Sequence, residues 1–240
     1  MRLAGFLGKS IIDRSGRDLG TIHDVRLVKS GPAIGSFGAS YLVHSLLAGS
    51  PSIGVRLGLH REELKGPWPL KALFRRVHAG IVTVHWSEVW SIEEDAVRLR
   101  SVLEPGEREL GLDSDLSAAA VLDAAFQLLD RQIIDVDGRM AGKIDDLDLE
   151  FSGEPQAPPR VVAIILGPGA LAPRITGRLG SRIGAIVGRI ANEPDPFEIS
   201  FGIVKRIDNH VELILPRDDL GIMGFEDWVR TRIISKIPGS

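Results

Sequence analysis

The feature that most constrains this chain is an internal repeat. Residues 9–27, KSIIDRSGRDLGTIHDVRL, align without a gap with residues 131–149, RQIIDVDGRMAGKIDDLDL, at a constant offset of 122 positions. The identical positions are Ile11, Ile12, Asp13, Gly16, Arg17, Gly20, Ile22, Asp24 and Leu27 in the first copy and the residues 122 positions later in the second. Such a repeat within 240 residues predicts two copies of one small module rather than a single large domain.

The repeated motif has the chemistry of a bent β-hairpin. The isoleucine pair that opens each copy is β-branched and favours a half-buried strand. Ser15-Gly16 and Asp137-Gly138 suit a two-residue turn, because glycine tolerates positive φ. Gly20 and Gly142 lie within the predicted strands, where glycine usually marks a bulge or a tight bend.

Later segments of the two copies match more loosely, but in the same order. The expected strand regions are 41–47, 81–92 and 96–99 in the first copy and 161–166, 196–207 and 211–215 in the second. Short, bent strands repeated within a hundred residues suggest a small closed barrel. The expected fold class is an all-β core with accessory helices, arranged as two small tandem β-barrels in a pseudo-twofold arrangement, with no sheet spanning both copies.

Composition divides the chain into four parts. We expect a first barrel at 1–100, an acidic helical linker at 101–126, a second barrel at 127–221 and a C-terminal helical tail at 222–240. Residues 1–100 carry a net charge of +5, whereas residues 101–130 carry −6. The linker helix is expected around Ser114–Asp130.

The pattern I-I-D-x-x-G-R-x-x-G-x-I-x-D, at 11–24 and again at 133–146, resembles the PRC-barrel family. That family includes the cytoplasmic domain of the photosynthetic reaction-centre H subunit and the C-terminal domain of a ribosome-maturation factor. The resemblance implies a β-barrel that assembles with other macromolecules and has no known catalytic centre. Both copies depart from a minimal member by an inserted, helix-containing loop, at about 48–80 and 167–195, which puts the family's partners in doubt for this chain.

The acidic run at Asp145, Asp146, Asp148 and Glu150 invites a metal or acid–base hypothesis. Strand alternation instead predicts a hydrated outer face opposite Leu147, Leu149 and Phe151, since one strand supplies too few convergent ligands. The recurring aspartates are expected to bond backbone amides where the strand bends. The predicted structural set is Asp13, Gly16, Gly20, Asp24, Asp135, Gly138, Gly142 and Asp146.

Residues 174–191 predict a helix with an apolar side, a glycine stripe and an arginine side. Three interpretations stay open: packing on the chain's own barrel, contact with a partner helix or second subunit, and binding to a membrane surface. The candidate partner-binding residues are Arg178, Gly180, Arg182, Gly184, Gly188 and Arg189. A second inserted helix is expected at 69–79, and Trp86 and Trp90 are expected in the core.

No pattern in the sequence indicates catalysis. Cysteine is absent, the six histidines show no zinc-like spacing, and neither a nucleophile elbow nor a phosphate-binding loop occurs. We therefore expect no catalytic residue, metal or cofactor, and a cytoplasmic location. The predicted function is a non-catalytic scaffold that binds protein partners through its barrel faces and inserted helices, with self-association left open and no small-molecule substrate expected. An RNA- or ribosome-associated factor and a peripheral membrane adaptor are the alternatives.

Overall fold

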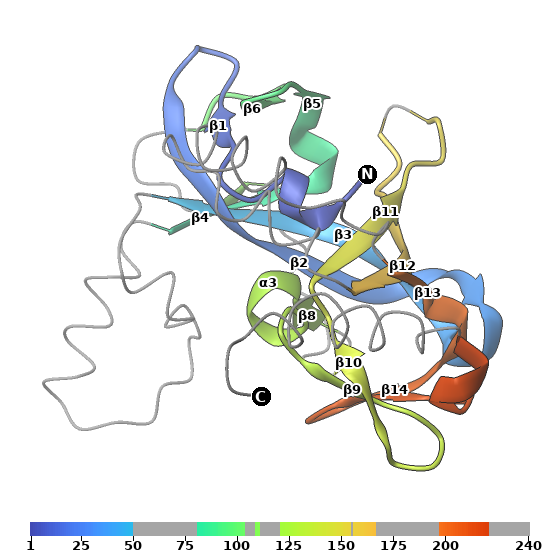
Figure 1. The fold of residues 1–240 in the computed structure, drawn as a ribbon. Helices are drawn as coiled ribbons and strands as arrows, with labels where there is room; N and C mark the ends of the chain where they lie inside the picture. Colours follow the sequence, from blue (N-terminus) through green and yellow to red (C-terminus); the bar gives the residue numbers. More distant parts are fainter. Residues whose placement is uncertain (50–80, 104–108, 111–120, 155, 167–196, 221–240) are drawn as a thin grey trace, which may run out of the picture.

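The computed structural model describes residues 1–49, 81–103, 109–110, 121–154, 156–166 and 197–220. These residues form mostly β-strands with a few short helical turns, which confirms the predicted all-β core. Long paired strands cross the middle of the molecule, and smaller groups of strands lie at its two ends (Figure 1).

The first copy contains six strands and three short 3-10 turns among the described residues. Its strands are β1 (Ser10–Ile12), β2 (Asp18–Ile34), β3 (Gly38–Gly49), β4 (Ile81–His85), β5 (Val89–Ile92) and β6 (Ala96–Leu99). The turns are η1 (Leu3–Gly5), η2 (Gly35–Phe37) and η3 (Trp86–Glu88).

The second copy repeats this order. Its elements are β9 (Gln132–Ile134), β10 (Met140–Lys143), β11 (Asp146–Glu150), β12 (Arg160–Leu166), β13 (Phe197–Ser200), η6 (Phe201–Ile203), β14 (Val204–Ile207) and β15 (Val211–Leu213). Between the copies lie β7 (Glu109–Leu110), β8 (Val121–Asp123) and α3 (Ala124–Gln127), and η7 (Arg217–Leu220) follows β15.

The opening hairpin has the same register in both copies, as the repeat predicted. Ser10 faces Thr21 and Ile12 faces Asp18, while Gln132 faces Lys143 and Ile134 faces Met140, each 122 positions later. In both copies the first strand also pairs in parallel with the last, β1 with β6 and β9 with β15. The prediction of one hairpin in two equivalent settings is confirmed.

The equivalence extends to irregular positions. The ladder between β2 and β3 shifts register between Arg26 and Leu27, and the ladder between β11 and β12 shifts at the same place, between Asp148 and Leu149. Leu27 faces Val43 and Leu149 faces Val161. Equivalent residues are therefore 122 positions apart on β2 and β11 but 118 positions apart on β3 and β12. Leu42 of β3 accordingly corresponds to Arg160 of β12.

One sheet spans both copies, so the expectation that no sheet would do so is wrong. Its path runs β11-β12-β3-β2-β1-β6-β5, and a separate sheet runs β10-β9-β15-β14. The copies join where Arg160 of β12 faces Leu42 of β3, and the Val43 amide donates to the Pro159 carbonyl at 2.9 Å. The junction forms because β4 pairs with β3 only from Ser45 onward, which leaves an open strand edge before that residue.

Burial corrects two details of the predicted core. Leu147 and Leu149 are buried as alternation predicts, but Phe151 is 40% exposed. Trp86 is buried, whereas Trp90 is 69% exposed and its ring lies near the Arg100 guanidinium. Trp90 stands on β5, which ends the path of strands in its sheet.

The described end of the linker, residues 121–130, differs from the expected long helix. It contains β8, which pairs with β2, and α3, which spans only four residues. Residues 111–120 lie outside the described part of the chain, as do the predicted helices at 69–79 and 174–191, the predicted tail helix and the candidate residues Arg178, Gly180, Arg182, Gly184, Gly188 and Arg189.

Substitution of the turn glycines tests the hairpin assignment. Gly16 and Gly138 have φ values of 88° and 78°, and an added Cβ would meet no atom within 4 Å at either position. Alanine there should cost about 1 kcal/mol from backbone strain alone. Chemical denaturation of Gly16→Ala and Gly138→Ala measures this cost. A neutral result at Gly138 would contradict the assigned turn.

Candidate functional site

The first pair of recurring aspartates closes the two hairpin turns. The Asp13 carboxylate accepts from the Ser15 and Arg17 amides at 2.9 and 3.0 Å. Asp135 accepts from the Asp137 and Arg139 amides at 3.0 and 2.7 Å. Burial alone would raise the pKa of both carboxyl groups. The pKa values are nevertheless lowered, first by the hydrogen bond from the Ser15 hydroxyl to Asp13 and by that from the Arg217 amide to Asp135, and then by the turn amides. These two side chains hold the turns in shape.

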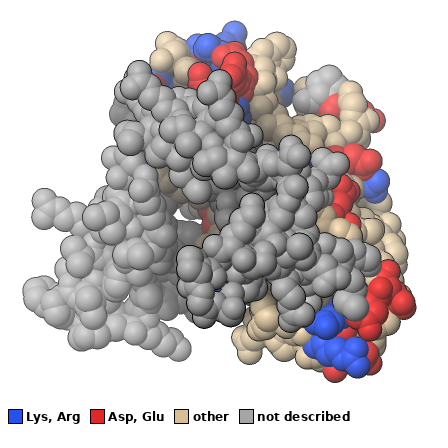
Figure 2. All heavy atoms as spheres, in the orientation of Figure 1, with Lys and Arg blue, Asp and Glu red and all other residues tan. Residues whose placement is uncertain are grey.

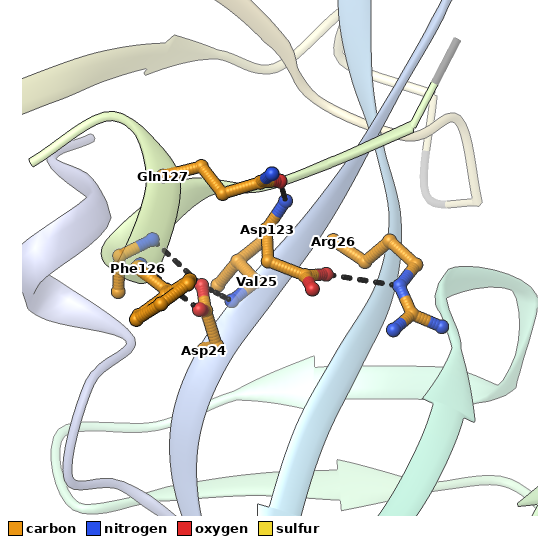
Figure 3. Close-up of polar contacts among 7 residues, drawn as sticks. Asp24, Val25, Arg26, Asp123, Phe126 and Gln127 are labelled. Carbon is orange, nitrogen blue, oxygen red and sulfur yellow. Dashed lines mark hydrogen bonds and ion pairs between the residues drawn. The ribbon is translucent and has the colours of Figure 1, made fainter. Parts of the chain in front are cut away.

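The second pair, Asp24 and Asp146, joins the two copies. Asp24 is 4% exposed and Asp146 fully buried, so the predicted hydrated position of Asp146 is wrong. Asp24 accepts from the amides of Ala125 and Phe126 at 2.6 and 3.1 Å, as Figure 3 shows for Phe126. Asp146 accepts from the Ala4 amide at 3.0 Å. Each aspartate thus bonds the segment that precedes the opposite copy.

Those preceding segments, which we call the upstream segments (residues 1–8 and 121–130), are themselves equivalent. The Gly8 amide donates to the Ile22 carbonyl at 2.8 Å, and the Asp130 amide donates to the Ile144 carbonyl at 2.7 Å, both 122 positions later. Asp130 has φ of 64°, matching the positive φ of Gly8. Each upstream segment is therefore bonded to its own copy and capped by the other.

The capping follows from unpaired amides at helix starts. The first amides of a helix lack partners within the helix and need an outside acceptor. The N-cap of α3 is Asp123, whose side chain makes no capping hydrogen bond. Asp123 instead accepts from Arg26 at 3.0 Å, which leaves the capping position to Asp24 (Figure 3). Asp146 takes the same place at η1.

The upstream segments also line equivalent strand edges. Strand β8 pairs with β2, with Arg26 facing Asp123 and Leu27 facing Leu122. On the other copy, Arg2 forms a β-bridge with Asp148, and the Leu149 amide donates to the Met1 carbonyl at 2.8 Å. Leu149 corresponds to Leu27, so each edge is covered at the same position.

A second contact between the copies involves the loop after β2. The Ser36 hydroxyl donates to the Gly202 carbonyl at 2.8 Å, and Phe37 packs edge-on against Phe201 with ring centroids 4.9 Å apart. Gly35 has φ of 49°, and a Cβ added there would lie 2.3 Å from the Gly202 carbonyl oxygen. Only glycine allows this close backbone approach.

The equivalent contact exists in the opposite sense. Trp86 opens η3 as Phe201 opens η6, and the Trp86 indole N–H donates to the Ala157 carbonyl in the loop between β11 and β12 at 3.2 Å. Its ring lies 6.1 Å from that of Phe151. Trp86, the first residue after β4, therefore contacts the hairpin of β11 and β12 in the second copy. Phe201, the first residue after β13, contacts the hairpin of β2 and β3 in the first copy.

Burial makes the Asp24 carboxyl group a weaker acid than an ordinary aspartate. Burial, together with the nearby negative charge of Asp123, raises the pKa of Asp24 to about 6, although hydrogen bonds from Ala125, Val25 and Phe126 oppose the shift. The folded chain therefore favours protonated Asp24 over a range where the unfolded chain has lost that proton.

This shift predicts a pH dependence of stability. The raised pKa of Asp24 stabilises the folded chain fully at a pH below the pKa that Asp24 has in the unfolded chain. This stabilisation is lost as pH rises through about 6, because over that range the unfolded chain releases the Asp24 proton more readily than the folded chain does. The loss should be on the order of 3 kcal/mol. Denaturation of the wild type and Asp24→Asn across this range isolates it, since asparagine does not titrate. Parallel stability curves for the two proteins would contradict the prediction.

Charge on the described surface is mixed. Positive and negative side chains lie next to one another at the top and lower right of Figure 2. Arg98 pairs with Glu93, Arg160 with Glu150, and both Lys205 and Arg206 with Glu212. Among the described residues, no group of three or more His, Asp and Glu side chains could hold a metal ion. Within the same part of the chain, no helix is long and apolar enough to cross a membrane.

The sequence predicted the turn residues but missed the contact between the copies. Gly35, Ser36 and Gly202 carried no recognisable signal, because their importance depends on a distant chain segment. Asp24 and Asp146 did carry one, because the repeat keeps an aspartate at this position in both copies, but its distant partners could not be read from the sequence. No protein-family model matches the chain, and no curated protein sequence matches it significantly.

Proposed function

We propose that this chain is a non-catalytic assembly module, built from two PRC-barrel-like barrels in a pseudo-twofold arrangement, that docks protein partners in the cytoplasm. The observation that carries the proposal is the use made of the recurring carboxylates. Asp13 and Asp135 bond turn amides, and Asp24 and Asp146 bond amides of the opposite upstream segment. The four recurring aspartates thus serve to hold the hairpin turns in shape and to join the two copies into one rigid frame.

A rigid frame of this kind suits presentation of its inserted loops. The inserts, at about 48–80 and 167–195, leave the frame after β3 and β12 and return at β4 and β13, so each has two fixed ends. Because loops on a rigid scaffold commonly carry binding residues, the partner surface is proposed on these inserts and on the barrel faces. The mixed charge of the described surface favours a protein partner over RNA.

Two matched variants of the full chain test this proposal. Gly180→Leu with Gly184→Leu alters the glycine stripe without changing charge, whereas Arg178→Gln, Arg182→Gln and Arg189→Gln remove charge without adding bulk. Each is used to capture partners from the source cell, with and without nuclease, and each is titrated against RNA and against anionic vesicles.

The proposal expects a nuclease-resistant protein partner whose capture is lost in the leucine variant. Circular dichroism and denaturation show whether that variant still folds. Capture abolished by nuclease would instead support the ribosome-associated function. Salt-sensitive vesicle binding that is lost in the glutamine variant would support the membrane adaptor. Either result, with no protein partner retained, would overturn the proposal.

A further inference from the structure

The junction between β3 and β12 joins equivalent residues. Leu42 corresponds to Arg160, and these two residues face one another in an antiparallel ladder. An antiparallel pair centred on equivalent positions is the arrangement that a twofold axis generates. The axis therefore passes through the Leu42 and Arg160 pair.

The other contacts obey the same axis. The amides of Ala4 and Phe126, 122 positions apart, bond Asp146 and Asp24, which are also 122 positions apart. The loop after β2 meets η6, while the loop after β11 meets η3. These contacts between the described parts of the two copies run in both directions, which is the property of an isologous interface.

We infer that the contact between the copies is a self-complementary dimer interface whose fitting partner is a second copy of the same module, and that the two halves hold together without the connector. This inference rests on the paired architecture of the proposed function. Each half carries the aspartate that caps the upstream segment of the other, so separation would take from Asp24 and Asp146 the amide partners that lie in the opposite half. Separation would expose Asp24 and Asp146 together with the aromatic contacts of Phe201 and Trp86.

Cleavage of the folded full chain tests the inference. A specific protease site is inserted between Leu112 and Asp113, so that the upstream segment 121–130 stays with the second half. The cut protein is then compared with the uncut protein by size-exclusion chromatography, and denaturing gels verify the cut. The two halves should elute together at the volume of the uncut chain.

A disulfide across the axis adds a check on the register. The Val43 amide bonds the Pro159 carbonyl, so the adjacent Leu42 and Arg160 form the closer, non-hydrogen-bonded kind of pair. Since the chain has no cysteine, Leu42→Cys with Arg160→Cys should link the cut halves on a non-reducing gel. Leu42→Cys with Glu150→Cys is the control, because Glu150 lies one strand further out.

The outcomes separate this inference from the proposed function. Co-elution with a link only in the Leu42→Cys, Arg160→Cys protein supports the inference. Halves that separate on cleavage, or that link equally in the control, overturn it. If the halves separate while the uncut chain still captures its protein partner, the proposed function stands; if the uncut chain captures none, that function fails whatever the halves do.

Discussion

Gly35→Ala is expected to destabilise the chain by about 3 kcal/mol or more, whereas Gly38→Ala, three residues away, should cost about 1 kcal/mol. Both glycines have positive φ, at 49° and 83°, so both substitutions carry backbone strain. They differ in what an added Cβ would meet. At Gly35 it would lie 2.3 Å from the Gly202 carbonyl oxygen of the other copy, and at Gly38 it would meet nothing within 4 Å.

Chemical denaturation of the two variants measures this difference. The atoms that obstruct Gly35→Ala belong to backbone, which cannot rotate away as a flexible side chain would. The strain can be relieved only if the loop after β2 moves off η6. Equal losses of stability in the two variants would mean that the contact between the copies does not require the observed close approach.

Asp24→Ala and Asp146→Ala should have the second large effect. Removing the Asp24 side chain takes the Asp24 acceptor from the half-buried amides of Ala125 and Phe126, and each such loss costs up to about 1–3 kcal/mol. The loss for Asp24→Ala should be greatest at about pH 4, where the wild-type side chain is protonated and most stabilising, and smaller above about pH 6.

Glu150→Ala is the matched control for these substitutions. Glu150 lies on the same strand as Asp146 but is exposed and pairs with Arg160 at the surface. Its replacement should change stability by less than about 1 kcal/mol. Denaturation curves that place Asp146→Ala at the level of Glu150→Ala would contradict the capping role.

Local chemistry explains what the sequence predicted well. The turn glycines, the β-branched pairs and Asp13 act within a few residues of one another, so their pattern is sufficient to predict the hairpin in each copy. The repeat then predicts equivalent strands elsewhere. These expectations needed no knowledge of how the copies meet.

Asp146 illustrates what local pattern could not predict. Alternation along β11 places its side chain opposite Leu147, which would expose it on an isolated sheet. Its partner Ala4 is 142 positions away in the sequence, and that distant segment covers the face that alternation assigns to water. The joined sheet escaped prediction for the same reason, because the open edge of β3 is filled by a strand from the other copy.

Amide hydrogen exchange in Asp24→Ala and Asp146→Ala, which remove the accepting oxygens, tests the crossed capping most directly. Asp24→Ala should accelerate exchange at Ala125 and Phe126 while Ala4 stays protected, and Asp146→Ala should accelerate exchange at Ala4 while Ala125 and Phe126 stay protected. The account would be contradicted if Asp24→Ala exposed Ala4 and Asp146→Ala exposed Ala125, or if neither substitution changed exchange at these three amides.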